Sequence, residues 1–548
     1  MPRRAGGMRF LEVALLLACA FSTPAFAQAP GTPSGPPLAP GQRPLPVQPL
    51  PVQPLPVEPL PPGTAPTPGE APTKPPETVP PFTTTTPTTT TPSPVPVIPE
   101  LQQIGPPSTI PSTPQRVLPA AVGLPAAATF QFQPSVTLMQ EYTDNFNLTR
   151  SDKQENFRSS ISPGIQLGIN SPQVKGLISY TFTPAYDTAV DDFSFFHSLL
   201  GQVVWQATPR WQLTLADAFT KSDEATQADR LGLRQERRDF TSNTVSLTSD
   251  YLIGRVITRQ SFRYITFNDD SGNEAGQDTR TYLLGASATI PIYLTNAASV
   301  GYEFVDSKTD QSGGTTSATT GSQNFFSSDS FKVRGHQFTA GASRQLSPIT
   351  TVGLRGSYAL RTATDDTGDE DFRLWNFAAF ARYILPGRLT LDGSAGVTGL
   401  SSDSSGSVGP NFFTVTSLGY QLGRALILLG FDSGFSETFT EGQNFGVVET
   451  RGVTGSISYA ITPAISGTLS GSWRRNKPTG VGDASIQSDT TTWTGSVGFS
   501  WRIQRRLLLD LGYTYTDQTD NRSTGVQTLG TDGGYTENRV QAALRVVY

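Results

Sequence analysis

The chain has very few of the residues on which cross-links, metal sites and most catalytic centres depend. It holds one cysteine and two histidines in 548 residues, and Cys19 lies in an N-terminal stretch with the pattern of a signal peptide. Because no thiol follows that stretch, disulfides and cysteine chemistry are excluded there. His197 adjoins Ser198, but neighbours on a strand point to opposite faces, and His336 is far away in the sequence. We therefore expect no enzyme activity, no catalytic residue and no cofactor.

Long apolar runs are also missing. After the N-terminal stretch, no uncharged apolar run reaches the roughly 18 residues that a membrane-spanning helix needs. The net charge of -5 is modest and no basic stripe is present, which argues against a nucleic-acid partner. Acidic residues cluster at Asp269-Asp270 with Glu274 and at Asp365-Asp366, but their spacing does not match a calcium-binding loop. We expect solvated loops there and no metal.

Residues 1–27 have the three parts of a secretory signal peptide. Arginines come first, an apolar stretch occupies residues 13–21, and Ala25-Phe26-Ala27 is a small-residue cleavage site. In an alternative interpretation, Cys19 is the acylated residue of a lipoprotein, although Leu16-Leu17-Ala18 matches that pattern imperfectly.

Residues 28–128 are dominated by proline and threonine. The motif Pro44-Leu45-Pro46-Val47-Gln48 is followed by two close copies of itself. Proline at this density removes backbone donors and fixes φ, so extended polyproline II is expected in place of helix or sheet. The segment is predicted to be a disordered periplasmic spacer. A functional alternative is a tether to the cell wall or to polysaccharide-export components.

Residues 129–548 alternate between apolar and polar side chains, and the pattern is clearest over residues 491–515. Trp493, Val497 and Trp501 share one parity, while Ser496 and Arg502 share the other. Successive side chains on a strand point to opposite faces, so one face is apolar and the other is polar. Each arm of this hairpin is about ten residues long, which suits a tilted strand that crosses a bilayer.

The same pattern recurs to the end of the chain and gives about twenty strands, within a range of roughly sixteen to twenty-two. Short turns such as Thr208-Pro209-Arg210 alternate with long polar loops over residues 221–239, 306–330 and 517–538. Outer-membrane barrels have short periplasmic turns and long outer loops. With both ends of the barrel in the periplasm, the number of strands has to be even. Residues 245–267 are the weakest part of the pattern, because both parities carry polar side chains there.

The tryptophans and the last strand agree with a membrane barrel. Val540, Ala542, Leu544 and Val546 share the apolar face of the last strand, and the chain stops at Tyr548, which is typical of the signal read by the barrel-assembly machinery. Aromatic rings gather at the two surfaces of a bilayer, so we predict an interfacial aromatic girdle. Its members are Trp205, Trp211, Trp375, Trp473, Trp493 and Trp501.

Charged residues fall on the polar parity of the predicted strands. On the lipid side each would cost about 2–4 kcal/mol at the midplane, so they should face the lumen. There they either pair with one another or form a charge-selective wall, and arginines outnumber acids among them. The predicted pore-lining residues are Arg355, Arg361, Arg382, Asp392, Asp432, Arg474, Arg502, Asp510, Arg539 and Arg545.

Several short motifs resemble a known family. The stretch Glu141-Tyr142-Thr143-Asp144-Asn145, the stretch Ile161-Ser162-Pro163-Gly164-Ile165 and the hairpin at Thr208-Pro209-Arg210 are similar to the β-barrel porin 2 family of outer-membrane proteins. The resemblance covers roughly residues 130–548. It implies a porin-like barrel of the kind that often occurs with exopolysaccharide or capsule production, and it implies no catalytic residue.

The sequence therefore predicts an all-β protein, a transmembrane antiparallel β-barrel in the outer membrane of a Gram-negative cell. Its expected partners are outer-membrane lipid and the barrel-assembly machinery. The predicted function is a porin-like channel for passive passage of small polar solutes, with a link to exopolysaccharide export. One alternative is a structural or anchoring barrel with a closed lumen, and a third hypothesis is a soluble, secreted β-solenoid or sandwich.

Overall fold

The computed structural model describes residues 130–224, 237, 239–269, 276–293, 295–312, 330–365, 368–403, 406–441, 446–479, 489–521 and 534–548. The predicted signal peptide and the predicted Pro-rich spacer lie outside the described residues, and so do Asp270, Glu274 and Asp366 of the acidic clusters.

The described residues form twenty strands and one short 3-10 helix. The first ten strands are β1 (Phe130–Thr143), β2 (Asn156–Asn170), β3 (Val174–Asp187), β4 (Asp192–Thr208), β5 (Trp211–Ser222), β6 (Phe240–Ile253), β7 (Val256–Asp269), β8 (Gly276–Pro291), β9 (Asn296–Ser312) and β10 (Ser330–Ser347). The others are β11 (Thr350–Asp365), β12 (Gly368–Leu385), β13 (Leu389–Ser402), β14 (Gly406–Leu422), β15 (Ala425–Glu437), β16 (Val447–Thr462), β17 (Ile465–Pro478), β18 (Asp489–Gln504), β19 (Leu507–Asn521) and β20 (Gly534–Val547), with the helix η1 (Thr438–Glu441) between β15 and β16.

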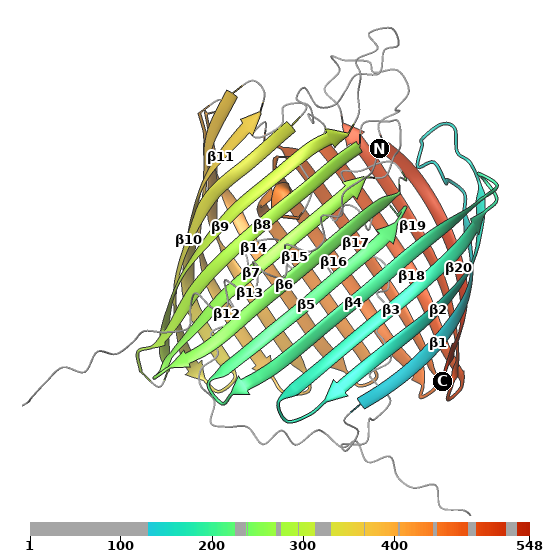
Figure 1. Ribbon diagram of the computed structural model, residues 1–548, viewed down its shortest axis with the longest axis horizontal. Helices are drawn as coiled ribbons and strands as arrows, with labels where there is room; N and C mark the ends of the chain where they lie inside the picture. Colours follow the sequence, from blue (N-terminus) through green and yellow to red (C-terminus); the bar gives the residue numbers. More distant parts are fainter. Residues whose placement is uncertain are drawn as a thin grey trace, which may run out of the picture. The chain divides into compact units, whose positions relative to one another are not determined.

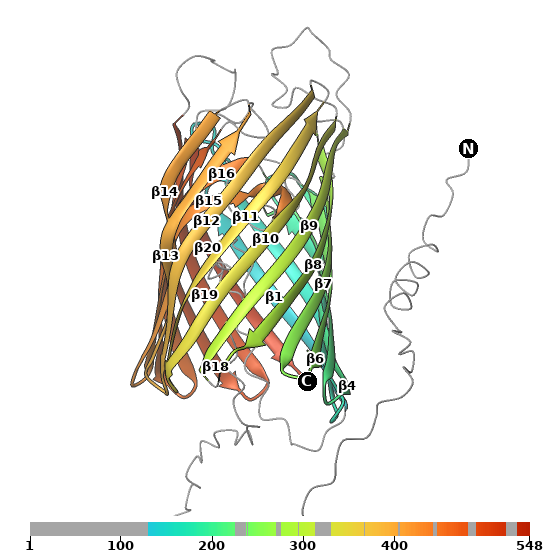
Figure 2. The ribbon, with the colours of Figure 1, turned by 90° about the vertical axis from the view of Figure 1, so that its left-hand side faces the viewer.

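The strands close into one antiparallel barrel. Each strand pairs with its neighbours in the sequence, and β1 pairs with β20 from Ser135↔Val547 to Thr143↔Arg539. The strands cross the barrel wall at a tilt, as Figures 1 and 2 show. The predicted barrel, its antiparallel pairing and a count of about twenty strands are confirmed. The hypothesis of a solenoid or sandwich is wrong, because the sheet has no free edge.

The alternation of side chains explains why the wall stands between an apolar exterior and a polar interior. In β1, Leu138 is 51% exposed while its neighbour Thr137 is 2% exposed. In β18, Trp493 is 57% exposed on the outside and Thr490 is 1% exposed on the inside. The exposed positions are mostly apolar, so the outer face matches hydrocarbon, as in outer-membrane barrels.

The two ends of the barrel differ. The chain enters β1 and leaves β20 at the end with the short turns, such as residues 209–210 and 463–464; we call this the turn end. The opposite end, the loop end, has the longest connections, such as residues 144–155 and 223–239. Short and long connections do not alternate strictly along the chain, because residues 188–191 at the loop end form a short connection.

The strands are longer than predicted. β9 continues to Ser312 and β19 to Asn521, so part of each expected loop, residues 306–330 and 517–538, is strand. The prediction ended those strands where apolar side chains stopped. Ladder hydrogen bonds do not need apolar side chains, so the strands continue beyond the apolar band. The weakly patterned region also forms a regular pair, β6 with β7.

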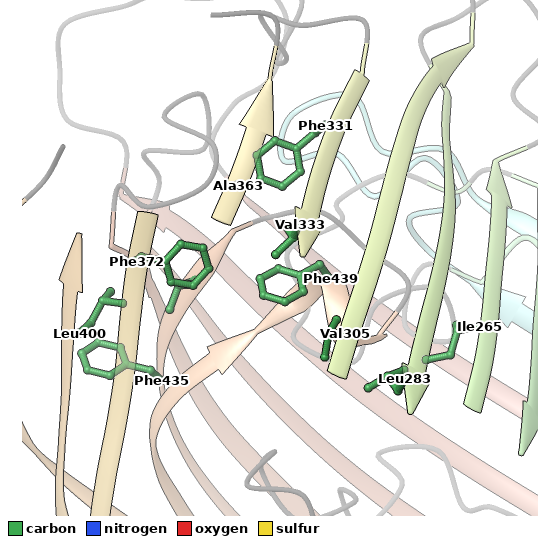
Figure 3. Close-up of a cluster of buried hydrophobic side chains, with 11 residues drawn as sticks. Ile265, Leu283, Val305, Phe331, Val333, Ala363, Phe372, Leu400, Phe435 and Phe439 are labelled. Atoms are coloured by element: carbon green, nitrogen blue, oxygen red, sulfur yellow. The ribbon is translucent and has the colours of Figure 1, made fainter. Parts of the chain in front are cut away.

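The apolar core lies inside the barrel near the loop end. It joins the inner faces of β7 to β13 to the tip of the β15–β16 hairpin (Figure 3). Among the described residues, no helix is long and apolar enough to cross a membrane.

Candidate functional site

The strand register places every predicted pore-lining residue on the inner face of the wall. These residues pair across strands with other inward positions and alternate with exposed apolar ones. They are Arg355, Arg361, Arg382, Asp392, Asp432, Arg474, Arg502, Asp510, Arg539 and Arg545. Their role in lining a pore stays a prediction.

Several of these residues are joined to one another or to the wall. The Nη2 of Arg474 lies 3.3 Å from Oδ1 of Asp432, and the Nε of Arg382 lies 3.6 Å from Oδ2 of Asp392. Arg355 donates to the hydroxyl of Ser394 at 2.5 Å. Most of these charged side chains are therefore held by ion pairs or hydrogen bonds to other residues of the barrel wall.

The predicted excess of inward arginines is wrong. The inner face also carries acidic residues that the sequence analysis did not assign. Most lie toward the loop end, where the apolar parity fades, but Asp250 lies near the turn end of β6, within the weakly patterned residues 245–267. These acidic residues are Glu141, Asp187, Asp223, Glu224, Asp250, Glu303, Glu370, Glu437 and Glu537. Arginines missed in the same way include Arg158, Arg237 and Arg259. The described inner face therefore carries charges of both signs, and the arginines of its loop-end half are mostly paired with carboxylates.

A charged network covers the inner wall near the loop end, where β20 and β1 to β5 meet. Its side chains are between 1% and 16% exposed. We call it the rim network, and its members are Glu141, Arg158, Asp187, Asp223, Glu224, Arg237, Glu537 and Arg539.

Arg158 holds one half of the rim network. Its Nε lies 2.8 Å from Oδ1 of Asp187, and its Nη2 lies 2.5 Å from Oδ2 of Asp223. The guanidinium also stands over the ring of Phe196, 5.1 Å from the ring centre. Arg158 thereby joins β2 to β3, to β4 and to the end of β5.

Arg237 and Arg539 hold the other half. Arg237 lies 2.7 Å from Glu224 and 3.0 Å from Glu537, and Arg539 lies 3.0 Å from each of the same two carboxylates. Arg539 and Glu537 belong to β20, while Glu224 follows β5. The network therefore crosses the seam where the last strand meets the first.

Glu224 and Arg237 stay ionised within the network because each stabilises the charge of the other. Burial by itself raises the pKa of the Glu224 carboxyl, but the guanidinium groups of Arg237, Arg539 and Arg158 more than reverse this and hold that pKa well below its usual range. Burial also lowers the pKa of Arg237, but the carboxylate of Glu224 raises it above its ordinary value. The carboxylate of Glu224 and the guanidinium of Arg237 therefore remain charged at neutral pH.

The second feature of the lumen is the tip of the β15–β16 hairpin, described at residues 434–441 and 446–450, which we call the infolded hairpin. Pairing between β14 and β15 ends at Thr414↔Ser433, and beyond it β15 continues with β16 alone. Phe431 is 39% exposed on the outer face, whereas Phe435, on the same parity, is 6% exposed inside the barrel. The hairpin therefore bends inward, and its lipid-facing side comes to lie against the inner wall.

A glycine allows this bend. A Cβ on Gly434 would stand 2.9 Å from the ring of Phe413 on β14, which is closer than real Cβ contacts come. The absence of a side chain at this position lets the hairpin pass directly beneath β14.

The infolded hairpin packs against the inner faces of β8 to β13 (Figure 3). Phe439 points toward Val305 and Val333, and its ring centre lies 6.3 Å from that of Phe372. Its main-chain oxygen accepts a hydrogen bond from the hydroxyl of Thr281 at 2.9 Å. Apolar burial and backbone hydrogen bonding thus fix the hairpin across part of the lumen.

One buried ion pair anchors the hairpin. Arg361 on β11 donates from Nε to Oε1 of Glu437 and from Nη2 to Oε2, each at 3.1 Å. The Arg361 side chain is 0% exposed. Arg361 therefore faces inward as predicted, but the hairpin covers it, and it does not line open space.

The sequence analysis did not identify this hairpin. Among the long loops that it did identify is residues 306–330, of which residues 313–329 lie outside the described residues. The clue in the sequence is Glu437, a carboxylate on the parity that carries Ile427, Leu429 and Phe431 to the lipid. A charge there is costly in hydrocarbon, so that side had to leave the membrane.

Elsewhere the lumen is open to solvent. Leu177 and Leu200 share the inward parity of Asp187 and Arg158, yet they are 37% and 54% exposed. Apolar side chains on the inner face of a packed barrel would be buried. At this level, between the rim network and the turn end, side chains of the described residues do not fill the interior.

The outer face holds all six tryptophans. Trp205 and Trp211 lie beside each other near the turn end, with tilted rings whose centres are 6.3 Å apart, and Trp473 and Trp493 do the same toward the loop end at 6.2 Å. Trp375 and Trp501 share the outward parity of their strands. This is the placement expected of a girdle, and its contact with a bilayer surface remains a prediction.

The histidines also lie outside, each beside a tyrosine. The Nδ1 of His197 is 2.9 Å from the hydroxyl of Tyr180, and the Nδ1 of His336 is 2.8 Å from that of Tyr302. Within the described part of the chain, no group of three or more His, Cys, Asp or Glu residues could hold a metal ion.

A closed antiparallel barrel with an apolar exterior and a charged, partly covered interior defines a large outer-membrane β-barrel. No protein-family model matches the chain, and no curated protein matches it. The resemblance to the β-barrel porin 2 family therefore stays a prediction.

Solved structures of other barrels are similar at low identity. A mutant of the ferric enterobactin receptor from Pseudomonas aeruginosa is 12% identical over 76% of this chain and 80% of its own, with a TM-score of 0.43. The FrpB iron transporter from Neisseria meningitidis is 9% identical over 76% and 82%, with a TM-score of 0.42. The siderophore receptor PirA from Pseudomonas aeruginosa is 12% identical over 76% and 80%, with a TM-score of 0.38. The ligands of these proteins say nothing about what this chain binds.

Proposed function

We propose that this protein is a porin-like channel for passive passage of small polar solutes, narrowed near its loop end by the infolded hairpin. The observation that carries the proposal is the exposure of inward-facing Leu177 and Leu200, which indicates a solvent-filled interior. A barrel of this strand number is also wider than side chains alone can fill.

The charges of the described lumen support weak ion selectivity. Carboxylates and guanidiniums are intermixed, and most are joined in pairs, so neither sign forms a continuous wall. Of the two predicted alternatives, paired charges and a charge-selective wall, we therefore favour paired charges and a channel that passes small polar solutes of either sign.

The proposed location is the outer membrane of a Gram-negative cell, with the turn end in the periplasm. The longest connections lie at the opposite end, as is usual for outer loops. Tyr548 is 64% exposed at the turn end, and its backbone N–H donates to the carbonyl oxygen of Pro134 at 3.0 Å. This supports Tyr548 as the residue by which the barrel-assembly machinery recognises the closing strand.

Two finer suggestions do not belong to this proposal. The link to exopolysaccharide export depends on the family resemblance alone. The tether between the Pro-rich segment and the cell wall or polysaccharide-export components depends on composition alone.

The second candidate function is a structural barrel with a closed lumen. The rim network and the infolded hairpin favour it, because both fill space inside the wall with buried side chains.

Conductance across a planar bilayer separates the two candidates. The purified barrel should show heat-modifiable gel migration, which verifies folding, and should then give discrete current steps in symmetric salt. In a salt gradient, the reversal potential should lie close to zero. Verified insertion without any current would overturn the channel and leave the structural barrel.

A further inference from the structure

The outer face of β5 to β7 carries several polar side chains on the parity that elsewhere in the described wall is mostly apolar. Asp217 on β5 pairs with Gly201 on one side and Val245 on the other, on the parity that carries Leu215 and Leu247 outward. Leu215 is 49% exposed and Leu247 is 41% exposed. Asp217, Asn243 and Gln260 form what we call the outer polar patch.

The depth of Asp217 makes it unusual. It follows Trp211, at the turn end of β5, by six residues. At a rise of about 3.3 Å per residue and a tilt near 40°, it lies about 15 Å above that end, close to the middle of an apolar band about 25 Å tall. An ionisable side chain at that depth is costly against hydrocarbon, and such residues generally face protein or water.

The described part of the chain does not satisfy this patch. Oδ1 of Asp217 and Oδ1 of Asn243 are covered by the chain itself and accept no hydrogen bond from the described residues, whereas Oδ2 of Asp217 is not among the buried atoms and can be reached from outside the wall. Gln260 is exposed on the same outer face, with an amide that can donate. Lipid tails offer no donor to Oδ2 of Asp217, so the partner of this oxygen is a polar group from another molecule.

We propose that the outer polar patch is the contact between two copies of this chain, related by a two-fold axis along the membrane normal. Copies inserted in the same direction can be related only by rotation about that normal, so each residue keeps its depth. The partner of Asp217 must therefore lie at the depth of Asp217.

Gln260 meets this condition. It follows Val256, where β7 begins at the turn end, by four residues. This places it within about 5 Å of the depth of Asp217, a difference that a glutamine side chain can span. Asp217 and Gln260 stand on either side of β6, so an axis over Leu247 brings each Asp217 opposite the other copy's Gln260. The patch is thus self-complementary, with two such hydrogen bonds around a Leu247 contact.

Cysteine cross-linking tests the contact directly, because the only native cysteine lies in the predicted signal peptide. Leu247→Cys should form a disulfide-linked dimer in oxidised outer membranes, since the two Cβ atoms would lie near the axis. Val497→Cys is the matched control: it is also outward, exposed and at similar depth, but on β18. It should stay monomeric.

The role of the polar pair is tested in the Leu247→Cys background. Asp217→Leu should lower the cross-linked fraction roughly fivefold or more, because a polar contact within the membrane is lost. Asp217→Asn keeps an acceptor oxygen and should retain the cross-link. Each variant is checked for heat-modifiable migration, so loss of folding is distinguished from loss of contact.

Other results would overturn the proposal. A monomeric but folded Leu247→Cys protein would show that lipid covers the patch. A cross-linked product whose mass differs from two copies of the chain would assign the patch to a different membrane protein.

Discussion

Arg361 and Glu437 show how one buried pair sets the interior of this barrel. Arg361 is fully buried beneath the infolded hairpin, and Glu437, the last residue of β15, lies in that hairpin and pairs with Arg361. Breaking such a pair by removing one partner typically costs about 3–5 kcal/mol, whereas replacing both with apolar residues is often neutral. The pair therefore fixes the hairpin in place mainly by making its detachment costly for both charges.

A double-substitution cycle tests this anchor. Arg361→Met or Glu437→Leu alone leaves one uncompensated buried charge, so the hairpin should leave the wall and single-channel conductance should rise. The two substitutions together should return conductance toward that of the unmodified protein, because an apolar pair can pack there. If the increase in conductance of the double variant equals the sum of the increases of the two single variants, the pair does not act as a unit.

At the residue scale, parity predicted the side of the wall but not the surroundings. It placed Arg361, Arg474 and Arg539 inward, yet all three are buried against carboxylates. Ion pairing depends on which strands lie side by side and on loop residues such as Glu224, and the alternation along one strand contains neither. The rim network was missed for the same reason.

Among the elements, the sequence predicted the course of β20 but not that of β15. β20 has a regular alternation, so both its existence and its outward face were predicted. β15 follows the same alternation through Phe431 and then turns its apolar side inward. The turn depends on the close approach of Gly434 to Phe413 on another strand, which periodicity within β15 cannot show.

Two adjacent positions in β20 test the closing strand. Val546 lies on the outer face, opposite Val136 of β1, and Val547 on the inner face, opposite Ser135. Val546→Asp should block assembly, because it places a carboxylate against lipid, and removal of Tyr548 should do the same. Val547→Asp should assemble normally, since the carboxylate faces water. Outer-membrane levels and heat-modifiable migration measure both; equal assembly of Val546→Asp and Val547→Asp would refute the assignment of faces.

For the whole molecule, the closed barrel and its strand number followed from the sequence because every strand carries the same local pattern. The way the lumen is filled did not follow, because it depends on contacts between segments far apart in the chain. Glu437 reaches Arg361 across the interior, and Phe439 reaches Val305. The central claim is therefore that a water-filled barrel is narrowed by the infolded hairpin.

Shortening the hairpin tests that claim most directly. Ser433 and Arg451 are paired across β15 and β16, so Asn-Gly can replace residues 434–450 as a two-residue turn. The measurement is single-channel conductance of this variant beside the unmodified protein, both shown to be folded by heat-modifiable migration. We predict current steps in both, roughly twofold or more larger in the variant because its open cross-section is greater. Equal conductance in the two proteins would contradict the account.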